Sequence, residues 1–404
     1  MRHDFACPNL FNRAGKLISR GNSHAQDISK NLSVPSRVSG NPKVTVAARQ
    51  FPGAPECGRS IAGTKTMNID ARYSRQELFS PIGPEGQARI RAARVLIAGC
   101  GGLGSNSANV LARAGVGFLR IVDRDLVELT NLERQLLFEE SDARDGAPKA
   151  VAAARHLAAI NSEVRVESVV ADIGTDNIFD LLQGIDLVLD GFDNLQARYL
   201  LNDACTKHNV PWIYASCVSA TVMAGLFVPG KTACFRCLHR DLPEPGAVRT
   251  CDMAGIIAPA ALVAASIQAS IALRFLTGKA LPETSLIVAD AWDLSLDRIV
   301  VSRDENCPCC ALKQFDFLNM AGQQAITLCG RNAVQVRAVF ERRPDFKALA
   351  GRLGAVGAVR VNDHLLRLDA PPYELTLFED GRVIVKGTPD PKLARSLVAR
   401  WVGV

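Results

Sequence analysis

The sequence lacks the signals of an exported or disulfide-bonded protein. No apolar segment of the signal-peptide kind stands near its start, and its twelve cysteines are partly grouped as CxxC pairs. Such pairs are typical of metal sites in a reducing compartment, whereas disulfide scaffolds are typical of short secreted chains. We therefore expect a cytoplasmic protein.

An excess of positive charge is missing from most of the chain. The formal net charge of +6 comes from 47 Lys/Arg and 41 Asp/Glu, but residues 1–66 alone hold 10 basic and 3 acidic side chains. The remaining residues therefore have a net charge of −1. A folded part without basic character predicts no nucleic-acid partner.

Segment 1–66 also has little apolar periodicity. It is rich in Ser, Asn, Gly, Pro and Arg, a composition that cannot bury enough apolar surface to fold alone. Three interpretations are open: a disordered basic tail, an organellar transit peptide, or translation upstream of a working start at Met67. The prolines would interrupt the amphipathic helix of a transit peptide, which favours the other two.

A clean membrane-spanning run is absent as well. The most apolar stretch, residues 254–277, is interrupted by Pro259, Gln268 and Arg274 and consists mostly of small residues. These features favour a buried or subunit-interface helix, and we expect no membrane association.

The sequence does contain an alternation of strands and helices. Strands are predicted at 95–98, 118–122, 164–170 and 186–190, and helices at 102–115, 148–160, 176–183 and 195–208. This pattern predicts an α/β fold with a Rossmann-like, doubly wound, mostly parallel sheet.

Later strands, including 285–289 and 298–302, predict an antiparallel extension of the same sheet. We expect this first domain to cover residues 67–312. A separate small α/β domain is predicted at 325–404, with a hairpin at 379–382 and a closing helix from Pro391.

A short apolar strand runs into a glycine-rich turn that precedes a helix. Gly99, Gly101 and Gly104 have the G-x-G-x-x-G spacing, and Gly102 lies between them. Backbone N–H groups at such a helix N-terminus can bind an anion without side chains in the way. Asp123 ends the next strand, where a carboxylate can bind ribose hydroxyls. The motif alone also fits a plain strand-to-helix turn.

Further polar groups follow that a dinucleotide site would not need. Asn131, Arg134 and Lys149 supply donors and positive charge for a triphosphate, and Asp193 can bind magnesium. Each has an ordinary alternative, such as a surface ion pair for Arg134 or a helix N-cap for Asp193. Their joint occurrence in this order predicts an ATP site.

Two cysteine pairs predict a structural metal centre. Cys234 with Cys237 and Cys307 with Cys310 offer four thiolates, which suit tetrahedral zinc with no open position. A redox dithiol is the alternative for either pair alone. Cys309 has no assigned role. The cysteines predicted to be packing residues are Cys100, Cys205, Cys217 and Cys329.

These motifs together resemble the HesA/MoeB/ThiF proteins of the ubiquitin-activating-enzyme superfamily. The resemblance covers about residues 72–310 and includes the glycine turn, Asn131–Gln135, Pro148–Lys149, Asp190–Asn194 and the two CxxC pairs. It implies a homodimer that uses ATP and magnesium to adenylylate the C-terminal glycine of a ubiquitin-like sulfur-carrier protein ending in Gly-Gly. The implied pathway is thiamine or molybdopterin cofactor biosynthesis.

The resemblance assigns ribose, phosphate and metal binding to the residues already named, and it adds two more. Arg75 is implied to reach from one protomer into the nucleotide site of the other. Cys251, preceded by Arg249, matches a position that forms a covalent sulfur-transfer intermediate in some members and is dispensable in others. The carrier carboxylate is already ionised at neutral pH, so adenylation requires no general base.

Alternatives differ in what they leave unexplained. An NAD-dependent oxidoreductase would use the glycines and Asp123 but not Arg134, Lys149 or the cysteine pairs, and a silent carrier-binding subunit should have lost phosphate-site residues. tRNA- or peptide-modifying enzymes of the same superfamily share the adenylation site. Residues 328–331 lack the Cys-Arg-x-Gly-x-Arg loop of a rhodanese domain, so we expect sulfur from a separate donor such as a cysteine desulfurase.

Overall fold

The computed structural model describes residues 72–244, 254–279, 283–319, 325–328, 332–338, 340, 344–362 and 364–403. Segment 1–66 lies outside these residues, as do Arg249, Cys251 and Cys329, so the predictions made for them stay predictions. Residues 69–404 form one compact unit.

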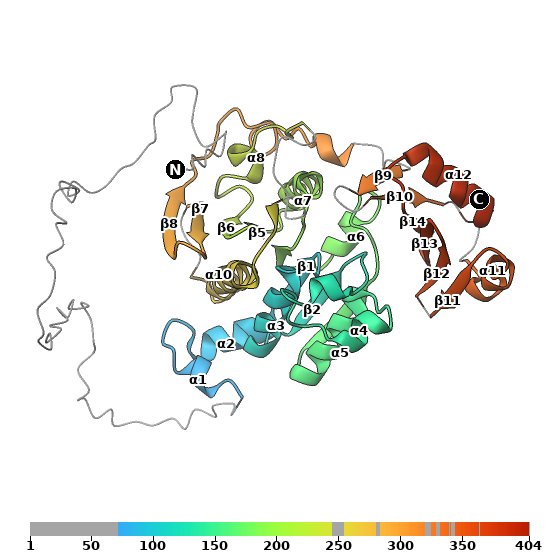
Figure 1. Ribbon diagram of the computed structural model, residues 1–404. Coiled ribbons are helices and arrows are strands. Elements are labelled where there is room, and N and C mark those ends of the chain that lie inside the picture. Colours follow the sequence, from blue (N-terminus) through green and yellow to red (C-terminus); the bar gives the residue numbers. More distant parts are fainter. Residues whose placement is uncertain are drawn as a thin grey trace, which may run out of the picture. The chain divides into compact units, whose positions relative to one another are not determined.

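An eight-stranded sheet forms the larger part of this unit (Figure 1). Its strands lie in the order β3-β2-β1-β4-β5-β6-β7-β8. They are β1 Arg94–Ala98, β2 Phe118–Val122, β3 Arg165–Val169, β4 Leu187–Asp190, β5 Trp212–Val218, β6 Thr221–Phe227, β7 Ser285–Asp290 and β8 Ser295–Val300. Neighbours from β3 to β5 pair in parallel, and β5 to β8 pair antiparallel. The predicted mostly parallel sheet with an antiparallel extension is confirmed.

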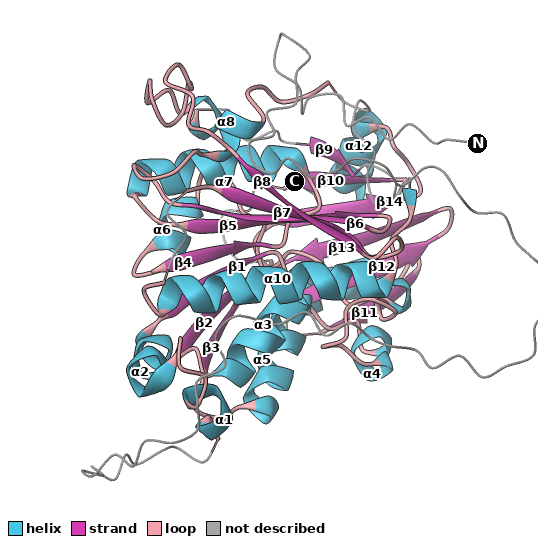
Figure 2. Ribbon diagram, turned by 90° about the vertical axis from the view of Figure 1, so that its left-hand side faces the viewer, coloured by secondary structure: helices cyan, strands magenta, loops and turns pink. Residues whose placement is uncertain are grey.

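Helices cover both faces of this sheet because its strands are apolar on both sides. Ile97 and Ile121 pack on one face and Leu96 and Val122 on the other. The first face holds α2 Gly83–Ala92, α3 Gly104–Ala114, α5 Lys149–Ile160 and α10 Ala258–Leu276; the second holds α6 Ile178–Leu182, α7 Leu195–His208 and α8 Phe235–Leu238. Figure 2 shows α10 and α3 crossing in front of the strands.

Helix α10 belongs to the core of the fold. Within the part of the chain that is described, it is the one helix long and apolar enough to span a membrane by length and composition. Its Gln268 is fully buried, and the side-chain amide donates to the carbonyl oxygens of Asp190 and Ile213, at 2.8 and 3.1 Å. One side of α10 is thus buried in the core, which agrees with the expected buried helix, and the alternative of a subunit-interface helix stays a prediction.

A second, six-stranded antiparallel sheet follows, in the order β11-β12-β13-β14-β10-β9. Its strands are β9 Ala325–Leu328, β10 Ala333–Arg337, β11 Ala358–Val361, β12 Leu365–Ala370, β13 Tyr373–Phe378 and β14 Arg382–Lys386, with helices α11 Phe346–Leu353 and α12 Pro391–Trp401. The predicted hairpin joins β13 to β14, and the Asp390 carboxylate caps the closing helix. The last strand of the first sheet was predicted three residues late, because a turn at 291–294 starts β8 at Ser295.

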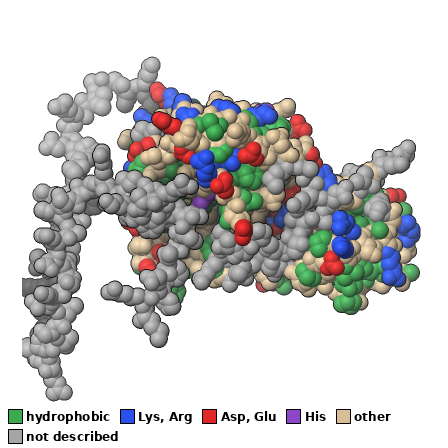
Figure 3. Space-filling model, turned by 90° about the horizontal axis from the view of Figure 1, so that it is seen from above, with side chains coloured by type: hydrophobic (Ala, Val, Ile, Leu, Met, Phe, Trp, Pro, Cys, Tyr) green, Lys and Arg blue, Asp and Glu red, His purple; other side chains and the backbone are tan. Residues whose placement is uncertain are grey.

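Charge on the surface is mixed in sign. On the face that Figure 3 shows, basic and acidic side chains are interspersed among hydrophobic and other groups. This distribution agrees with the near-zero net charge of the residues after 66.

Candidate functional site

The glycines of the turn after β1 divide into two kinds. Gly99 has φ +94°, and a Cβ there would lie 2.8 Å from the Gly191 carbonyl oxygen, while a Cβ on Gly104 would lie 1.9 Å from the Gly99 carbonyl oxygen. These two are glycine because backbone packs against them. A Cβ on Gly101 or Gly102 would meet nothing closer than 3.9 and 3.7 Å. Gly101 and Gly102 therefore leave open space beside the N-terminus of α3, where an anion can approach backbone N–H groups.

Asp123 is fixed beside this turn by backbone donors. Its Oδ2 accepts from the Cys100 N–H and its Oδ1 from the Asp125 N–H, both at 2.6 Å. Burial raises the pKa of Asp123, and the charge of Lys149 opposes that shift. A carboxylate offers about four acceptor positions, so positions remain for the hydroxyl groups of a ribose.

Lys149 is a buried cation at the start of α5. Its side chain is 5% exposed, and its Nζ lies 3.2 Å from Oδ2 of Asp125. The Lys149 N–H also donates to the Asp125 carbonyl oxygen at 2.9 Å, which fixes the start of α5 against the loop after β2. A buried ammonium group stays charged when a carboxylate pairs with it. The Lys149 charge can therefore bind a nearby anion strongly.

Arg134 lies against the glycine turn. Its Cγ would be 3.7 Å from a Cβ on Gly102, and the Asn106 side-chain amide donates both to the Gly102 carbonyl oxygen and to that of Arg134, at 2.7 and 2.9 Å. The guanidinium donates to the Thr130 carbonyl oxygen and to Glu133. The structure thus brings Arg134 to the same turn as the predicted phosphate cradle.

Two neighbouring amides complete this wall of the site. Asn131 is buried in the short 3₁₀ turn η1 (Leu129–Asn131), where its Oδ1 accepts from the Glu128 N–H at 3.3 Å. Gln135 is 3% exposed, and its Oε1 has no hydrogen-bond partner within the described ranges. The amide nitrogen of the same side chain lies 3.9 Å from where a Cβ on Gly101 would be, so Gln135 borders the turn. An orphaned buried oxygen there is typical of a site that expects a ligand or solvent donor.

The segment after β4 separates a structural carboxylate from an accessible one. Asp190 is fully buried and pairs with Arg198 at 2.8 Å, so it is part of the core. Asp193 is exposed at the start of α7, and the N-cap of that helix is Asn194, whose Oδ1 accepts from the Ala197 N–H. The ordinary N-cap role considered for Asp193 is therefore filled by its neighbour.

The four predicted cysteines come together. Sγ distances are 3.9 Å for Cys234–Cys237, 3.6 Å for Cys234–Cys307 and 3.5 Å for Cys237–Cys310, and all four sulfurs lie within 4.8 Å of one another. Zinc–sulfur bonds of about 2.3 Å in a tetrahedron place sulfurs about 3.8 Å apart, so the cluster fits zinc. The spare Cys309 is buried, with its sulfur accepting from the Asn202 side-chain amide at 3.2 Å.

Arg75 lies away from this chain's own glycine turn. It is exposed on α1 (Ser74–Glu77), which sits at the opposite end of α3: Tyr73 fills the space beside Gly115, and Gln76 donates to the Ala114 carbonyl oxygen. Eleven residues of α3 separate the two ends by about 16 Å. The geometry thus does not bring Arg75 to the other predicted site residues of the same chain.

Sequence reasoning missed two residues of the site, Asp125 and Gln135. Asp125 pairs with Lys149. Its position, two residues after Asp123 at the end of the same strand, was the sequence signal that could have identified it. Gln135 stood within the quoted Asn131–Gln135 motif, but only its burial marks it as a site residue.

Comparison with known proteins agrees with this geometry. The ThiF family profile matches residues 73–309, more than half of the chain. The sulfur carrier protein ThiS adenylyltransferase of Bacillus subtilis (strain 168) is 43% identical over 339 residues, which cover 83% of this chain and all of the relative. The SAMP-activating enzyme E1 of Haloferax volcanii is 37% identical over 61% of this chain and 92% of its own.

A solved structure is similar as well. The crystal structure of E. coli MccB with ATP superposes with a TM-score of 0.53 at 27% identity, over 60% of this chain and 75% of that one.

Proposed function

The chain belongs to the ThiF family, and we propose that it adenylylates the C-terminal glycine of a ubiquitin-like sulfur-carrier protein with ATP. The observation that carries this proposal is the pairing of an open glycine turn with two fixed cations, Arg134 beside Gly102 and Lys149 buried against Asp125. The names of the Bacillus and Haloferax relatives support the choice of reaction.

ATP binding follows from the residues gathered at the turn. Asp123 binds the ribose, and the N–H groups of Gly101, Gly102 and Gly104 with Asn131, Arg134 and Lys149 bind the triphosphate. Gly99 shapes the turn instead, because its N–H donates to the Val122 carbonyl oxygen at 2.8 Å. Lys149 stays paired with Asp125, and its positive charge attracts the phosphates. Magnesium, held through Asp193, would neutralise part of the charge on the departing pyrophosphate.

The reaction joins two anions, so the site must neutralise charge. A carboxylate oxygen of the carrier's last glycine forms a bond to the α-phosphorus, and the bond from that phosphorus to the bridging oxygen breaks. The electron pair leaves with pyrophosphate, and the carrier keeps AMP as an acyl-adenylate. Cations and N–H dipoles fixed in advance stabilise the developing charge without reorganisation.

Further features of the proposal come from the family resemblance. The protein acts in the cytoplasm as a homodimer in which Arg75 enters the partner's nucleotide site. This role is compatible with its position about 16 Å along α3 from its own turn. Cys251 takes part in loading sulfur that a separate donor, such as a cysteine desulfurase, supplies. The carrier serves thiamine or molybdopterin biosynthesis, and nucleic acid and membrane take no part.

Zinc binding at the four-cysteine cluster is structural in this proposal. Cys234, Cys237, Cys307 and Cys310 fill all four tetrahedral positions, so zinc there joins two distant loops and binds no substrate. Backbone support is present, because the Asp304 N–H points to Cys237 Sγ at 3.5 Å.

The test is to mix the protein with ATP, magnesium and candidate carriers ending in Gly-Gly. Intact mass spectrometry should show the carrier with one adenylyl group, together with pyrophosphate release. A carrier without its last glycine is the matched control and should stay unmodified. An NAD-dependent absorbance change without pyrophosphate release would instead support the oxidoreductase.

A further inference from the structure

The C-terminal sheet has one apolar face and one face on which polar and apolar side chains are mixed. Val334, Val336, Leu375, Val383 and Val385 are buried in a core with α11 and α12. Strand alternation turns the neighbouring residues to the other face, which carries Gln335, Arg367, Glu374, Thr376, Arg382 and Lys386. Gln335, Thr376 and Arg382 are buried on this face, so their polar groups need polar partners.

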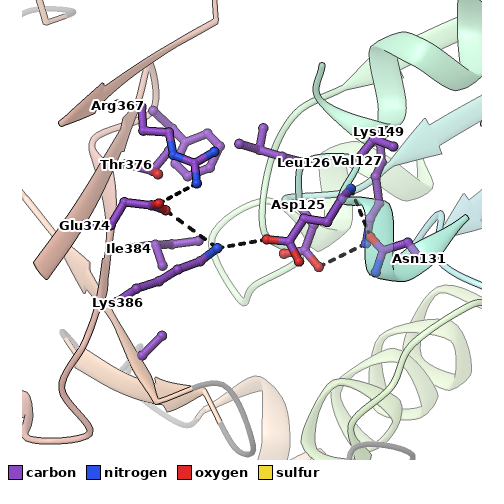
Figure 4. A pocket seen from close by; sticks show the side chains of 13 residues that line it. Asp125, Leu126, Val127, Asn131, Lys149, Arg367, Glu374, Thr376, Ile384 and Lys386 are labelled. Atoms are coloured by element: carbon purple, nitrogen blue, oxygen red, sulfur yellow. Dashed lines mark hydrogen bonds and ion pairs between the residues drawn. The ribbon is translucent and has the colours of Figure 1, made fainter. Parts of the chain in front are cut away.

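Some partners lie in the sheet itself, such as Glu374 for Arg367, and others lie in the loop after β2. Lys386 and Glu374 face Asp125, Asn131 and Lys149 across a small cavity of about 50 Å³ (Figure 4). The sheet therefore borders residues proposed to bind ATP.

Three side chains of the sheet hold this loop. Lys386 Nζ lies 2.8 Å from Oε1 of Glu128, and Arg382 donates to the Arg124 carbonyl oxygen at 3.5 Å. Gln335 accepts from the Arg124 guanidinium at 3.4 Å and donates to Asp172 at 3.0 Å. Contacts thus reach both ends of the segment 124–128.

The Glu128 end matters most for the nucleotide. The Glu128 carboxylate accepts from the Asn131 N–H, and the Asn131 side chain accepts in return from the Glu128 N–H, which closes a capping box around η1. Lys386 therefore pairs with the carboxylate that fixes the backbone of Asn131. Without Lys386, the partly exposed Glu128 carboxylate would spend part of its time hydrogen-bonded to water instead of to the Asn131 N–H.

We propose that Lys386 is a positioning residue for ATP, acting through Glu128 on Asn131. The inference rests on the proposed function, because it assigns the C-terminal sheet to the nucleotide site of that same reaction. It predicts an effect on ATP affinity that exceeds any effect on the chemical step, since Asn131 binds the nucleotide before and during reaction.

The test compares Lys386→Met with Arg337→Met. Arg337 lies on β10 of the same sheet and forms an ion pair of 2.8 Å with Asp176, away from the nucleotide loop. Lys386→Met removes the ion pairs with Glu128 and Glu374, and Arg337→Met removes the one with Asp176. All of these pairs are partly exposed, so both changes leave folding largely unaffected. In Lys386→Met, Glu374 retains Arg367 as its partner.

We expect the dissociation constant for ATP, measured by calorimetry without carrier, to rise about two- to fivefold in Lys386→Met. The KM for ATP in pyrophosphate exchange should rise by the same factor with kcat unchanged. Lys386→Arg should restore both values, and Lys386→Glu should weaken ATP further because it faces Glu128 and Glu374. Arg337→Met should bind as the wild type does.

Equal ATP affinity in wild type, Lys386→Met and Lys386→Glu would overturn the positioning role. An equal loss in Arg337→Met would also overturn it, because the effect would then belong to the whole interface. Failure of the proposed function has a different signature: the wild type would itself form no acyl-adenylate.

Discussion

Alanine substitutions in the glycine turn should separate folding from ATP binding. Gly101 and Gly102 have backbone conformations that alanine can adopt, and the nearest atoms to a new Cβ lie at 3.9 and 3.7 Å. Alanine also reduces the conformational freedom of the unfolded chain. Gly101→Ala should therefore leave the free energy of unfolding unchanged or raise it by up to about 1 kcal/mol.

The same methyl group should weaken ATP strongly. It would occupy the space through which a phosphate approaches the backbone N–H groups, and each charge-assisted hydrogen bond contributes about 1.5–3 kcal/mol. We expect ATP affinity, measured by calorimetry, to fall about ten- to a hundredfold in Gly101→Ala. Urea unfolding of the same sample checks that the fold is intact.

Gly104→Ala is the matched contrast. Its Cβ would lie 1.9 Å from the Gly99 carbonyl oxygen, and backbone cannot move aside as a side chain can. We expect a loss of at least about 3 kcal/mol in unfolding free energy. If Gly101→Ala bound ATP as tightly as the wild type, the turn would not be the phosphate cradle and the reasoning would fail.

Three further predictions follow from the site. Asp193→Ala should abolish carrier-dependent ATP–pyrophosphate exchange, whereas Cys251→Ser should leave exchange intact and reduce sulfur loading; full exchange in the first variant would contradict the metal assignment. Lys149→Met should lower the unfolding free energy by about 1.5–3 kcal/mol, because it removes a charged hydrogen bond to Asp125, which keeps Arg124 as a partner at 3.8 Å, and urea titration at neutral pH measures this. Atomic absorption should find one zinc per wild-type chain and per Cys309→Ser chain, but less in Cys234→Ser; equal zinc in all three would refute the cluster.

The first sheet could be predicted from the sequence because its signals are local. Apolar strands, the glycine spacing and Asp123 each depend on a few neighbouring residues, and both the fold and the family resemblance are confirmed. The cysteine pairs were also matched correctly across 69 residues, because tetrahedral coordination requires four ligands and two pairs offered them.

What could not be predicted were contacts without a local pattern. Lys386 and Glu128 are 258 positions apart, and the pattern of apolar and polar residues around either one does not indicate that they pair. The burial of Lys149 was similarly hidden, because a lysine at a helix start is ordinarily solvated and only the fold brings Asp125 over it.

The cysteine cluster also has a topological meaning. Cys234 and Cys307 are 73 positions apart, so a metal joining the sulfurs closes a ring of chain that contains α10. By the chain-entropy estimate used for covalent cross-links, a closure of that length destabilises the unfolded ensemble by about 4 kcal/mol. Ala261 of α10 lies 3.8 Å from where a Cβ on Gly102 would be. Chelating the metal should therefore lower the unfolding free energy of the part of the fold on which Gly102 packs, and urea unfolding of the stripped protein would measure the loss.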